Sequence, residues 1–148
     1  MKKIAFIGGG SFGTSLAILL GKKGYECSIW CHSEGTAEEI NINKENTKYL
    51  KGIQIPINVK ADTNIEEVVR DSKVVVLAVP SKAIREMARK IAPFLSKDEI
   101  VVTVAKGIEN HTLLRLSQVI EEEIKDHPIV VLSGPSHAEE VARDIPLL

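Results

Sequence analysis

A glycine-rich segment near the start of the chain has the spacing of a phosphate-binding loop. Residues 8–13 read Gly-Gly-Gly-Ser-Phe-Gly and match the pattern G-x-G-x-x-G. They follow a short apolar run at 4–7 and precede a stretch at 14–23 in which leucines recur at helical spacing. A strand, this loop and a helix in that order predict a site for the pyrophosphate of a dinucleotide, rather than only a glycine-rich turn.

Each glycine of the pattern in this loop has a distinct structural role. Gly8 permits a tight turn, Gly10 lets a pyrophosphate approach the backbone, and Gly13 lets the helix pack close to the strand. The first N–H groups of a helix have no partner inside it, and the helix dipole favours an anion there. Ser11 and Phe12 would supply some of these N–H groups.

The end of the second predicted strand, at residues 26–30, bears on the choice between NAD and NADP. An NAD site usually carries an acid at this point, which accepts a hydrogen bond from the ribose 2′-OH. Here the strand is followed by Cys31, His32 and Ser33, and Glu34 comes one or two residues late. His32 and Ser33 can donate to a 2′-phosphate, so the sequence favours NADP(H) over NAD(H). An ordinary exposed histidine is the alternative.

Two further segments place polar groups where predicted strands end. Lys106 follows the strand predicted at 100–105, and its cation could hold a phosphate or polarise a carbonyl oxygen. A plain surface lysine is as consistent with the spacing. Residues 132–139 combine a strand end, a Gly-Pro turn and a helix start, which is a second anion site. Ser136 could instead serve only as the cap of that helix, paired with Glu139.

The elements that must position these residues alternate along the chain. Apolar or β-branched runs predict strands at residues 4–7, 26–30, 74–79, 100–105 and 129–132. Helical spacing predicts helices at 14–23, 36–43, 63–70, 84–91, 113–124 and 136–144, with Thr63 as the cap of the third and a loop at 46–56. This alternation predicts an α/β fold of the Rossmann type. The sheet should be doubly wound and mainly parallel, with helices on both faces and ligands at the carboxyl ends of the strands.

Composition narrows the class of protein. The chain has 148 residues, is 44% apolar and 26% charged, and has a formal net charge of −1. One domain over 1–148 is expected, and the composition excludes collagen-like and mainly disordered proteins. No apolar run is long enough to span a membrane, and no export signal is present, so we expect a cytoplasmic protein. Cys27 and Cys31 have no metal-ligand set beside them and are expected to be small buried residues.

Nucleic-acid binding is not expected. The strongest candidate for it is a basic group on the helix predicted at 84–91, but Glu86 interrupts the group, and this helix needs a solvated face. The basic residues are Lys82, Arg85, Arg89 and Lys90.

Taken together, these motifs resemble one family. They are Gly-x-Gly-Ser-Phe-Gly-Thr-Ser-Leu-Ala at 8–17, Val-Pro-Ser at 79–81, Lys106-Gly107, and Ser-Gly-Pro-Ser at 133–136 followed by Ala138-Glu139. Over its whole length the chain resembles the N-terminal domain of the bacterial NAD(P)-dependent glycerol-3-phosphate dehydrogenases. The family often has Arg where this chain has His32, and Pro where it has Lys51.

The resemblance implies a function and a set of contacts. The reaction is the reversible reduction of dihydroxyacetone phosphate to sn-glycerol 3-phosphate, which feeds phospholipid synthesis. The implied cofactor contacts, besides the loop glycines Gly8, Gly10 and Gly13, are Ser11, Phe12, His32, Ser33, Tyr49, Lys106 and Ala138. The implied substrate contacts are Lys106, Gly134 and Ser136. No catalytic residue and no metal site are expected in this chain.

The resemblance also implies a longer parent enzyme. A helical second domain is expected to supply the lysine that acts as general acid/base, and the parent could be a homodimer. The fragment by itself is expected to bind cofactor without turnover. The sequence is also consistent with two other functions. One is another NADP-dependent reductase with a similar first domain, such as a ketopantoate or imino-acid reductase. The other is a non-catalytic domain that senses dinucleotides.

Overall fold

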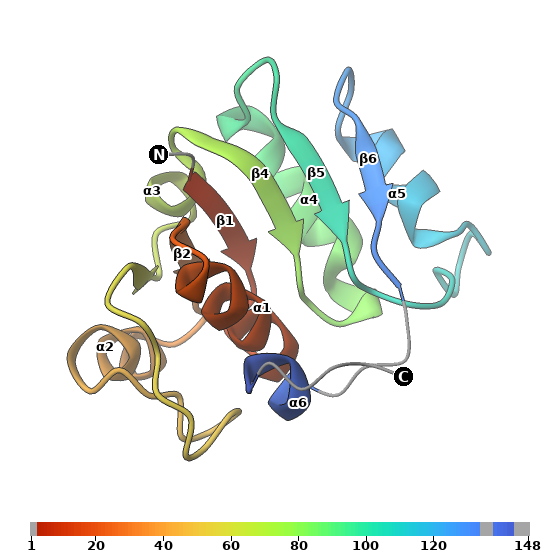
Figure 1. Ribbon diagram of the computed structural model, residues 1–148. Coiled ribbons are helices and arrows are strands. Elements are labelled where there is room, and N and C mark those ends of the chain that lie inside the picture. Colours follow the sequence, from red (N-terminus) through yellow and green to blue (C-terminus); the bar gives the residue numbers. More distant parts are fainter. Residues whose placement is uncertain (1–2, 134–137, 144–148) are drawn as a thin grey trace.

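The computed structural model, which describes residues 3–133 and 138–143, contains a six-stranded sheet in which every neighbouring pair is parallel (Figure 1). The strands are β1 (Lys3–Ile7), β2 (Glu26–Trp30), β3 (Val59–Asp62), β4 (Ser72–Leu77), β5 (Ile100–Thr103) and β6 (Ile129–Val131). Their order across the sheet is β3-β2-β1-β4-β5-β6. The order reverses between β1 and β4, and such a switch point is where doubly wound sheets bind ligands. The predicted fold class is confirmed.

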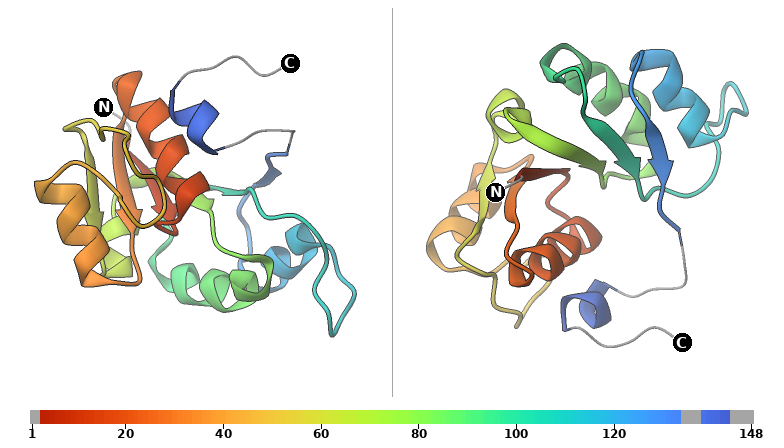
Figure 2. Two further views of the ribbon diagram at one scale, coloured as in Figure 1. Left: turned by 90° about the horizontal axis from the view of Figure 1, so that it is seen from below. Right: turned by 45° about the horizontal axis from the view of Figure 1, so that its top comes forward.

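Helices cover both faces of the sheet. They are α1 (Ser11–Lys22), α2 (Glu34–Ile42), α3 (Ile65–Val69), α4 (Ile84–Ile91), α5 (Leu116–Glu123) and α6 (Ala138–Ala142). Short 3₁₀ turns at Ser81–Ala83 and Ala92–Phe94 flank α4. Figures 1 and 2 show α1 and α6 on one face, and α4 and α5 on the other. Each face therefore has its own apolar core.

The alternation along β1 explains why both faces need cover. Ile4 and Phe6 belong to the core beneath α1, whereas Ala5 and Ile7 belong to the core beneath α4 and α5. All four side chains are at most 8% exposed. A strand buried on both faces reads as a continuous apolar run, which is why its position could be recognised in the sequence.

Helix α4 contributes the apolar face that its spacing predicts. Ile84, Met87, Ala88 and Ile91 are all buried, at 5% exposed or less. On its other side, Arg85 is ion-paired with glutamates from α5 and from the segment before it. The positive charge of this helix is thus largely compensated within the described part of the chain.

Strand β3 was not predicted. Its four residues read Val-Lys-Ala-Asp, and only Val59 and Ala61 are buried. An edge strand with two inward positions carries too little apolar signal to be told from a loop. Its backbone is paired instead by tertiary contact with β2, with Cys27 opposite Val59.

Two predicted helix starts are wrong. Asn64, not Thr63, caps α3, because the Asn64 side chain accepts hydrogen bonds from the backbone N–H groups of Glu66 and Glu67. Helix α5 begins at Leu116 and not at 113, because Leu113 has φ +60° and cannot belong to a right-handed helix. Leu113 fitted the helical spacing, yet its side chain is exposed.

Several predicted segments shift by a few residues. Helix α1 starts at Ser11 rather than at 14, and β4 runs over Ser72–Leu77 rather than 74–79. The earlier start of α1 matters for the site, because it puts Ser11 and Phe12 inside the first turn. The predicted cap Ser136 lies outside the described residues, and within them α6 begins at Ala138.

Candidate functional site

The glycine loop brings β1 and α1 closer together than side chains would allow. Gly8 has φ +126°, and a Cβ there would lie 2.3 Å from the carbonyl oxygen of Ala78. A Cβ on Gly13 would lie 2.4 Å from the carbonyl oxygen of Gly8 and 3.0 Å from the Cβ of Ala78. The two distances to carbonyl oxygens, 2.3 and 2.4 Å, are far below a normal contact, so the first and last glycines of the pattern are required by packing alone.

Gly10 differs from these two, because packing does not require it. A Cβ on Gly10 would meet no atom of the described residues within 4 Å. Gly10 is the N-cap of α1 and has an extended backbone, with φ −78° and ψ −172°. The first turn after it presents the backbone N–H groups of Ser11, Phe12 and Gly13, which have no partners inside the helix. The open space at Gly10 therefore adjoins a set of donors suited to an anion.

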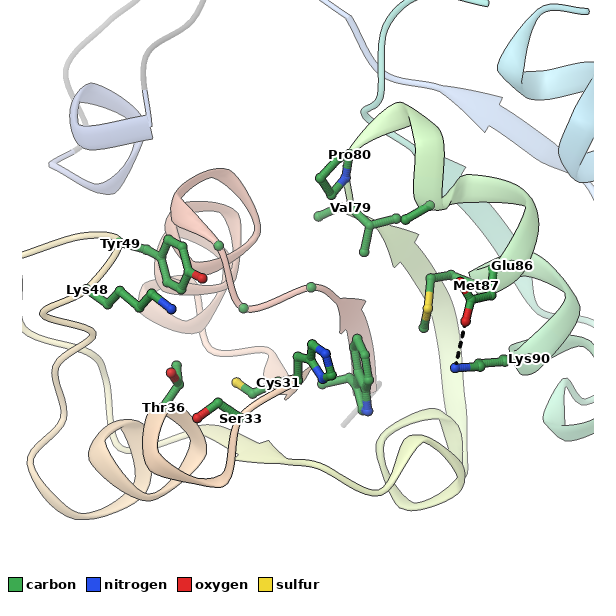
Figure 3. A pocket seen from close by; sticks show the side chains of 17 residues that line it. Cys31, Ser33, Thr36, Lys48, Tyr49, Val79, Pro80, Glu86, Met87 and Lys90 are labelled. Carbon is green, nitrogen blue, oxygen red and sulfur yellow. Dashed lines mark ion pairs between the residues drawn. The ribbon is translucent and has the colours of Figure 1, made fainter. Parts of the chain in front are cut away.

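A cavity of about 570 Å³ adjoins this loop at the carboxyl ends of β1, β2 and β4 (Figure 3). The backbone of the loop and the segment after β2 both border it. Its lining residues are Gly8, Gly9, Gly10, Trp30, Cys31, His32, Ser33, Thr36, Lys48, Tyr49, Ala78, Val79, Pro80, Ala83, Glu86, Met87 and Lys90. The cavity is therefore enclosed by segments from four separate parts of the chain.

Two facing sides of this cavity carry hydroxyl groups and a cation. Figure 3 shows Lys48 and Tyr49 across from Ser33 and Thr36, with the Lys48 ammonium turned toward the space between them. The Lys48 Nζ lies 5.1 Å from the centre of the Tyr49 ring. Ser33 is the N-cap of α2, but its side chain makes no capping hydrogen bond. These two sides of the cavity therefore offer an ammonium group and hydroxyl groups to an anion.

The rest of the cavity is more apolar. His32 stacks on Trp30, with ring centres 6.0 Å apart and planes inclined by 16°. The Trp30 indole is itself fixed, because Nε1 donates to the carbonyl oxygen of Thr63 at 2.9 Å. Met87 of α4 lines the same cavity (Figure 3). A cavity lined by two flat rings and a flexible apolar side chain suits an aromatic base.

Cys31 lines the first cavity, whereas Cys27 lies near the start of β2 and does not line it. Burial raises the pKa of the Cys31 thiol to about 11 and, with a smaller contribution from Glu26, that of Cys27 to about 12. Both are buried, at 3% exposed or less, as expected of small core residues. A Cβ on Gly9 would lie 2.7 Å from the Cys31 sulfur, so this thiol packs directly under the loop. Among the described residues no group of side chains could hold a metal ion.

A second cavity of about 440 Å³ lies on the other side of the switch point, near β5 and β6. Phe12, Leu16 and Leu19 of α1 line it, together with Lys106 and Ser133 at the strand ends. It shares Ala78 and Val79 with the first cavity. The two cavities thus adjoin one another across the end of β4, and a long ligand could extend from one to the other past the glycine loop.

The structure distributes the predicted site residues over these two cavities. The first cavity collects Gly8, Gly10, His32, Ser33 and Tyr49, and the second collects Phe12 and Lys106. Ser11 and Gly13 lie in the first turn of α1. Ala138 starts α6 and packs against the core beneath α1.

Gly134 and Ser136 lie outside the described residues. Thr36, Lys48 and Met87 also line the first cavity, although they are not among the site residues predicted from the sequence. Only Lys48, next to Tyr49, had any local signal, because the other two reach the cavity through the packing of helices.

No helix in the described part of the chain is long and apolar enough to cross a membrane.

The fold order, the glycine loop and the crevice over the switch point define a dinucleotide-binding domain of the Rossmann class. Residues 3–147 match the family model described as the N-terminus of NAD-dependent glycerol-3-phosphate dehydrogenase. The chain belongs to this family, and the predicted resemblance is confirmed.

Individual relatives agree with the family match. The chain is 54% identical over 146 residues to glycerol-3-phosphate dehydrogenase [NAD(P)+] of Clostridium tetani, covering 99% of this chain and 42% of the relative. It is 55% identical over 146 residues to the protein of the same name from Clostridium acetobutylicum, covering 99% and 44%. The crystal structure of glycerol-3-phosphate dehydrogenase from Coxiella burnetii superposes with a TM-score of 0.92 at 29% identity, covering 99% and 45%. The chain thus spans less than half the length of the relatives that it matches.

Proposed function

We propose that this chain is the cofactor-binding domain of a glycerol-3-phosphate dehydrogenase and binds a nicotinamide adenine dinucleotide along the crevice over the switch point. The observation that carries the proposal is the difference between the loop glycines. Gly8 and Gly13 are required by packing, whereas no atom in the described part of the chain lies close to where a Cβ on Gly10 would be, beside the N-terminus of α1. The fold therefore does not require a glycine at position 10. A pyrophosphate bound at the helix N-terminus would require it, because a side chain would obstruct the approach of the phosphates.

The first cavity fits the adenosine half of this cofactor. The part of the cavity lined by Trp30, His32 and Met87 would accept an adenine, and the part lined by Ser33 and Lys48 would accept the group on the ribose 2′ position. No acid ends β2, so a free 2′-OH has no carboxylate partner of the usual kind there. These features support a preference for NADP(H) over NAD(H), with the 2′-phosphate bound by His32, Ser33 and Lys48.

The second cavity fits the nicotinamide half of the cofactor and the substrate. When bound, the reduced nicotinamide supplies a hydride for a carbonyl carbon. Lys106 lines this cavity, where its cation would hold the phosphate or polarise the carbonyl oxygen of dihydroxyacetone phosphate. Gly134 and Ser136 would complete the substrate contacts. The general acid/base lysine would come from a helical domain in the remainder of the longer protein, which could act as a homodimer.

Calorimetric titration of this chain with NADPH and with NADH at one pH tests the proposal. We expect saturable binding of both, one per chain, with NADPH the tighter. Failure of both cofactors to bind would overturn the assignment of the crevice, and tighter binding of NADH would overturn the 2′-phosphate assignment. In the full-length protein we expect reduction of dihydroxyacetone phosphate, and Lys106→Ala should abolish protection of that protein by the phosphorylated substrate.

A further inference from the structure

A buried asparagine, Asn46, ties the glycine loop to a distant part of the chain. Asn46 is fully buried in the connection between α2 and β3. Its Nδ2 donates to the carbonyl oxygen of Gly9 at 2.8 Å and to the hydroxyl oxygen of Thr14 at 3.0 Å. The amide orientation follows from chemistry, because a carbonyl oxygen can only accept and so must face the NH₂ group.

The Asn46 backbone is itself held firmly. Its carbonyl oxygen accepts from the N–H of Leu50 at 2.7 Å, and Leu50 is 2% exposed. The next residue, Thr47, donates through its N–H and its hydroxyl to the carboxylate of Glu39, at 2.8 and 2.7 Å. The side chain of Asn46 is therefore presented to the loop from a rigid support.

The peptide group whose carbonyl oxygen accepts from Asn46 has little steric restraint of its own. It joins Gly9 to Gly10, and a peptide between two glycines has the least steric restraint on its rotation. The peptide is trans and planar, so its carbonyl and its N–H point in opposite directions. With the Gly9 carbonyl bonded to Asn46, the Gly10 N–H points away from Asn46. Gly10 lines the cavity and Asn46 does not.

We propose that Asn46 is a positioning residue that keeps the Gly9–Gly10 peptide turned so that the Gly10 N–H donates to the cofactor pyrophosphate. This inference rests on the proposed function and deepens it. Without the tether, the peptide could rotate and present the Gly9 carbonyl, an acceptor, to the phosphates. Such a rotation removes one donor and adds a repulsive oxygen at the same place.

The Asn46 acceptor supports this role. Its Oδ1 is buried and has no hydrogen-bond partner among the described residues. A buried acceptor without a partner destabilises a fold, and each such group calls for a reason. The reason for burying this amide is its NH₂ group, which makes the hydrogen bond to the glycine loop.

The test uses Asn46→Asp, which keeps the shape of the side chain and replaces the donor by an oxygen that repels the Gly9 carbonyl. The probes are ADP-ribose, which contains the pyrophosphate, and adenosine 2′-monophosphate, which lacks it. We expect the affinities for ADP-ribose, NADH and NADPH to fall by a common factor of about tenfold or more. Affinity for adenosine 2′-monophosphate should stay within about twofold, because this probe has no pyrophosphate to accept a hydrogen bond from the Gly10 N–H.

The matched control is Thr14→Val, which removes the second acceptor of the same NH₂ group and leaves the contact with Gly9 intact. It should lower the thermal stability while leaving the affinity for ADP-ribose unchanged. Asn46→Ala is the second variant, in which the tether is absent without repulsion. With either Asn46 variant, the Gly10 amide resonance should shift less on addition of ADP-ribose than it does in the unaltered chain.

Each other outcome decides against the proposal. Equal losses for ADP-ribose and adenosine 2′-monophosphate, or an equal loss in Thr14→Val, would assign Asn46 to general stability. Unchanged binding of ADP-ribose to Asn46→Asp would show that the peptide is held without it. If both Asn46 variants fail to fold while Thr14→Val folds, Asn46 is needed for folding and the proposal falls. Failure of the unaltered chain to bind ADP-ribose would instead overturn the proposed function.

Discussion

The carboxylate of Glu109 forms a two-pronged ion pair with the guanidinium of Arg85. Oε2 lies 2.7 Å from Nε, and Oε1 lies 2.9 Å from Nη2. Glu109 lies three residues after Lys106, in the connection between β5 and α5, and Arg85 lies in the first turn of α4. The pair therefore fastens the connection that carries Lys106 to the helix that also walls the first cavity.

This ion pair should make stability depend on pH in the acid range. The hydrogen bonds from Arg85, and then that from Thr112, lower the pKa of Glu109 from its usual 4.5 to about 2. Since the folded-state pKa is the lower one, the stabilisation is complete above about pH 4.5 and is lost as the pH falls towards 2. Glu109→Gln should therefore be less stable than the unaltered chain at pH 6, and the difference should shrink between pH 4.5 and 2.

Urea unfolding at a series of pH values measures this difference. Glu121→Gln is the matched control, because its side chain forms no ion pair among the described residues while it lies on α5 beside Glu122. A gap between Glu109→Gln and the unaltered chain that is constant from pH 6 to pH 2 would contradict the interpretation.

The glycine loop allows folding and binding to be separated. Gly8→Ala introduces a Cβ 2.3 Å from the Ala78 carbonyl oxygen, in a backbone with φ +126°, and should destabilise the fold severely. Gly10→Ala introduces a Cβ that has no atom of residues 3–133 or 138–143 within 4 Å, and should change the free energy of unfolding by less than about 1 kcal/mol.

The same Gly10→Ala variant should lose affinity for both NADH and NADPH, by about tenfold or more, because the new methyl group occupies the approach of the pyrophosphate. Thermal unfolding and calorimetric titration of the two variants check the pair of expectations. Unimpaired cofactor binding by Gly10→Ala would show that the open space beside Gly10 is not the phosphate site.

Lys48 should contribute to the choice between the two cofactors. Its ammonium faces the cavity wall formed by Ser33 and Thr36, where the 2′-phosphate is proposed to bind. Lys48→Met should weaken NADPH by about fivefold, the size expected of an exposed charge pair of roughly 1 kcal/mol, and leave NADH unchanged. Lys51→Met is the control, because Lys51 is exposed on the same connection and does not line the cavity. Equal effects of the two variants would reduce the role of Lys48 to net charge.

The cap of α3 can be checked by a pair of neighbouring substitutions. Asn64→Ala removes the acceptor for the N–H groups of Glu66 and Glu67, at 3.0 and 3.3 Å, and should cost about 1 kcal/mol. Thr63→Ala should cost only a few tenths of that, because its contact with Trp30 uses the backbone carbonyl, which alanine keeps. Denaturant unfolding of both variants measures the difference. A larger loss in Thr63→Ala would restore Thr63 as the cap.

Much of this architecture could be predicted from the sequence because it depends on local patterns. The buried strands are continuous apolar runs, and α4 has an apolar residue at each position that faces the core. The roles of Gly8 and Gly13 follow from the strand–turn–helix context, since a helix cannot approach a strand so closely if a side chain intervenes. In these places the local sequence and the tertiary fold require the same residue.

Other features were decided only by contacts between distant segments. Strand β3 has two buried residues and exists because β2 pairs with it. Leu113 fits a helical period, but its backbone turns to φ +60° as the chain enters α5. Asn46 reaches Gly9 across 37 residues of sequence, and no period or motif relates the two. A hydrogen bond between such positions depends on where the folded sheet and its helices carry the chain, and that information is present only in the assembled structure.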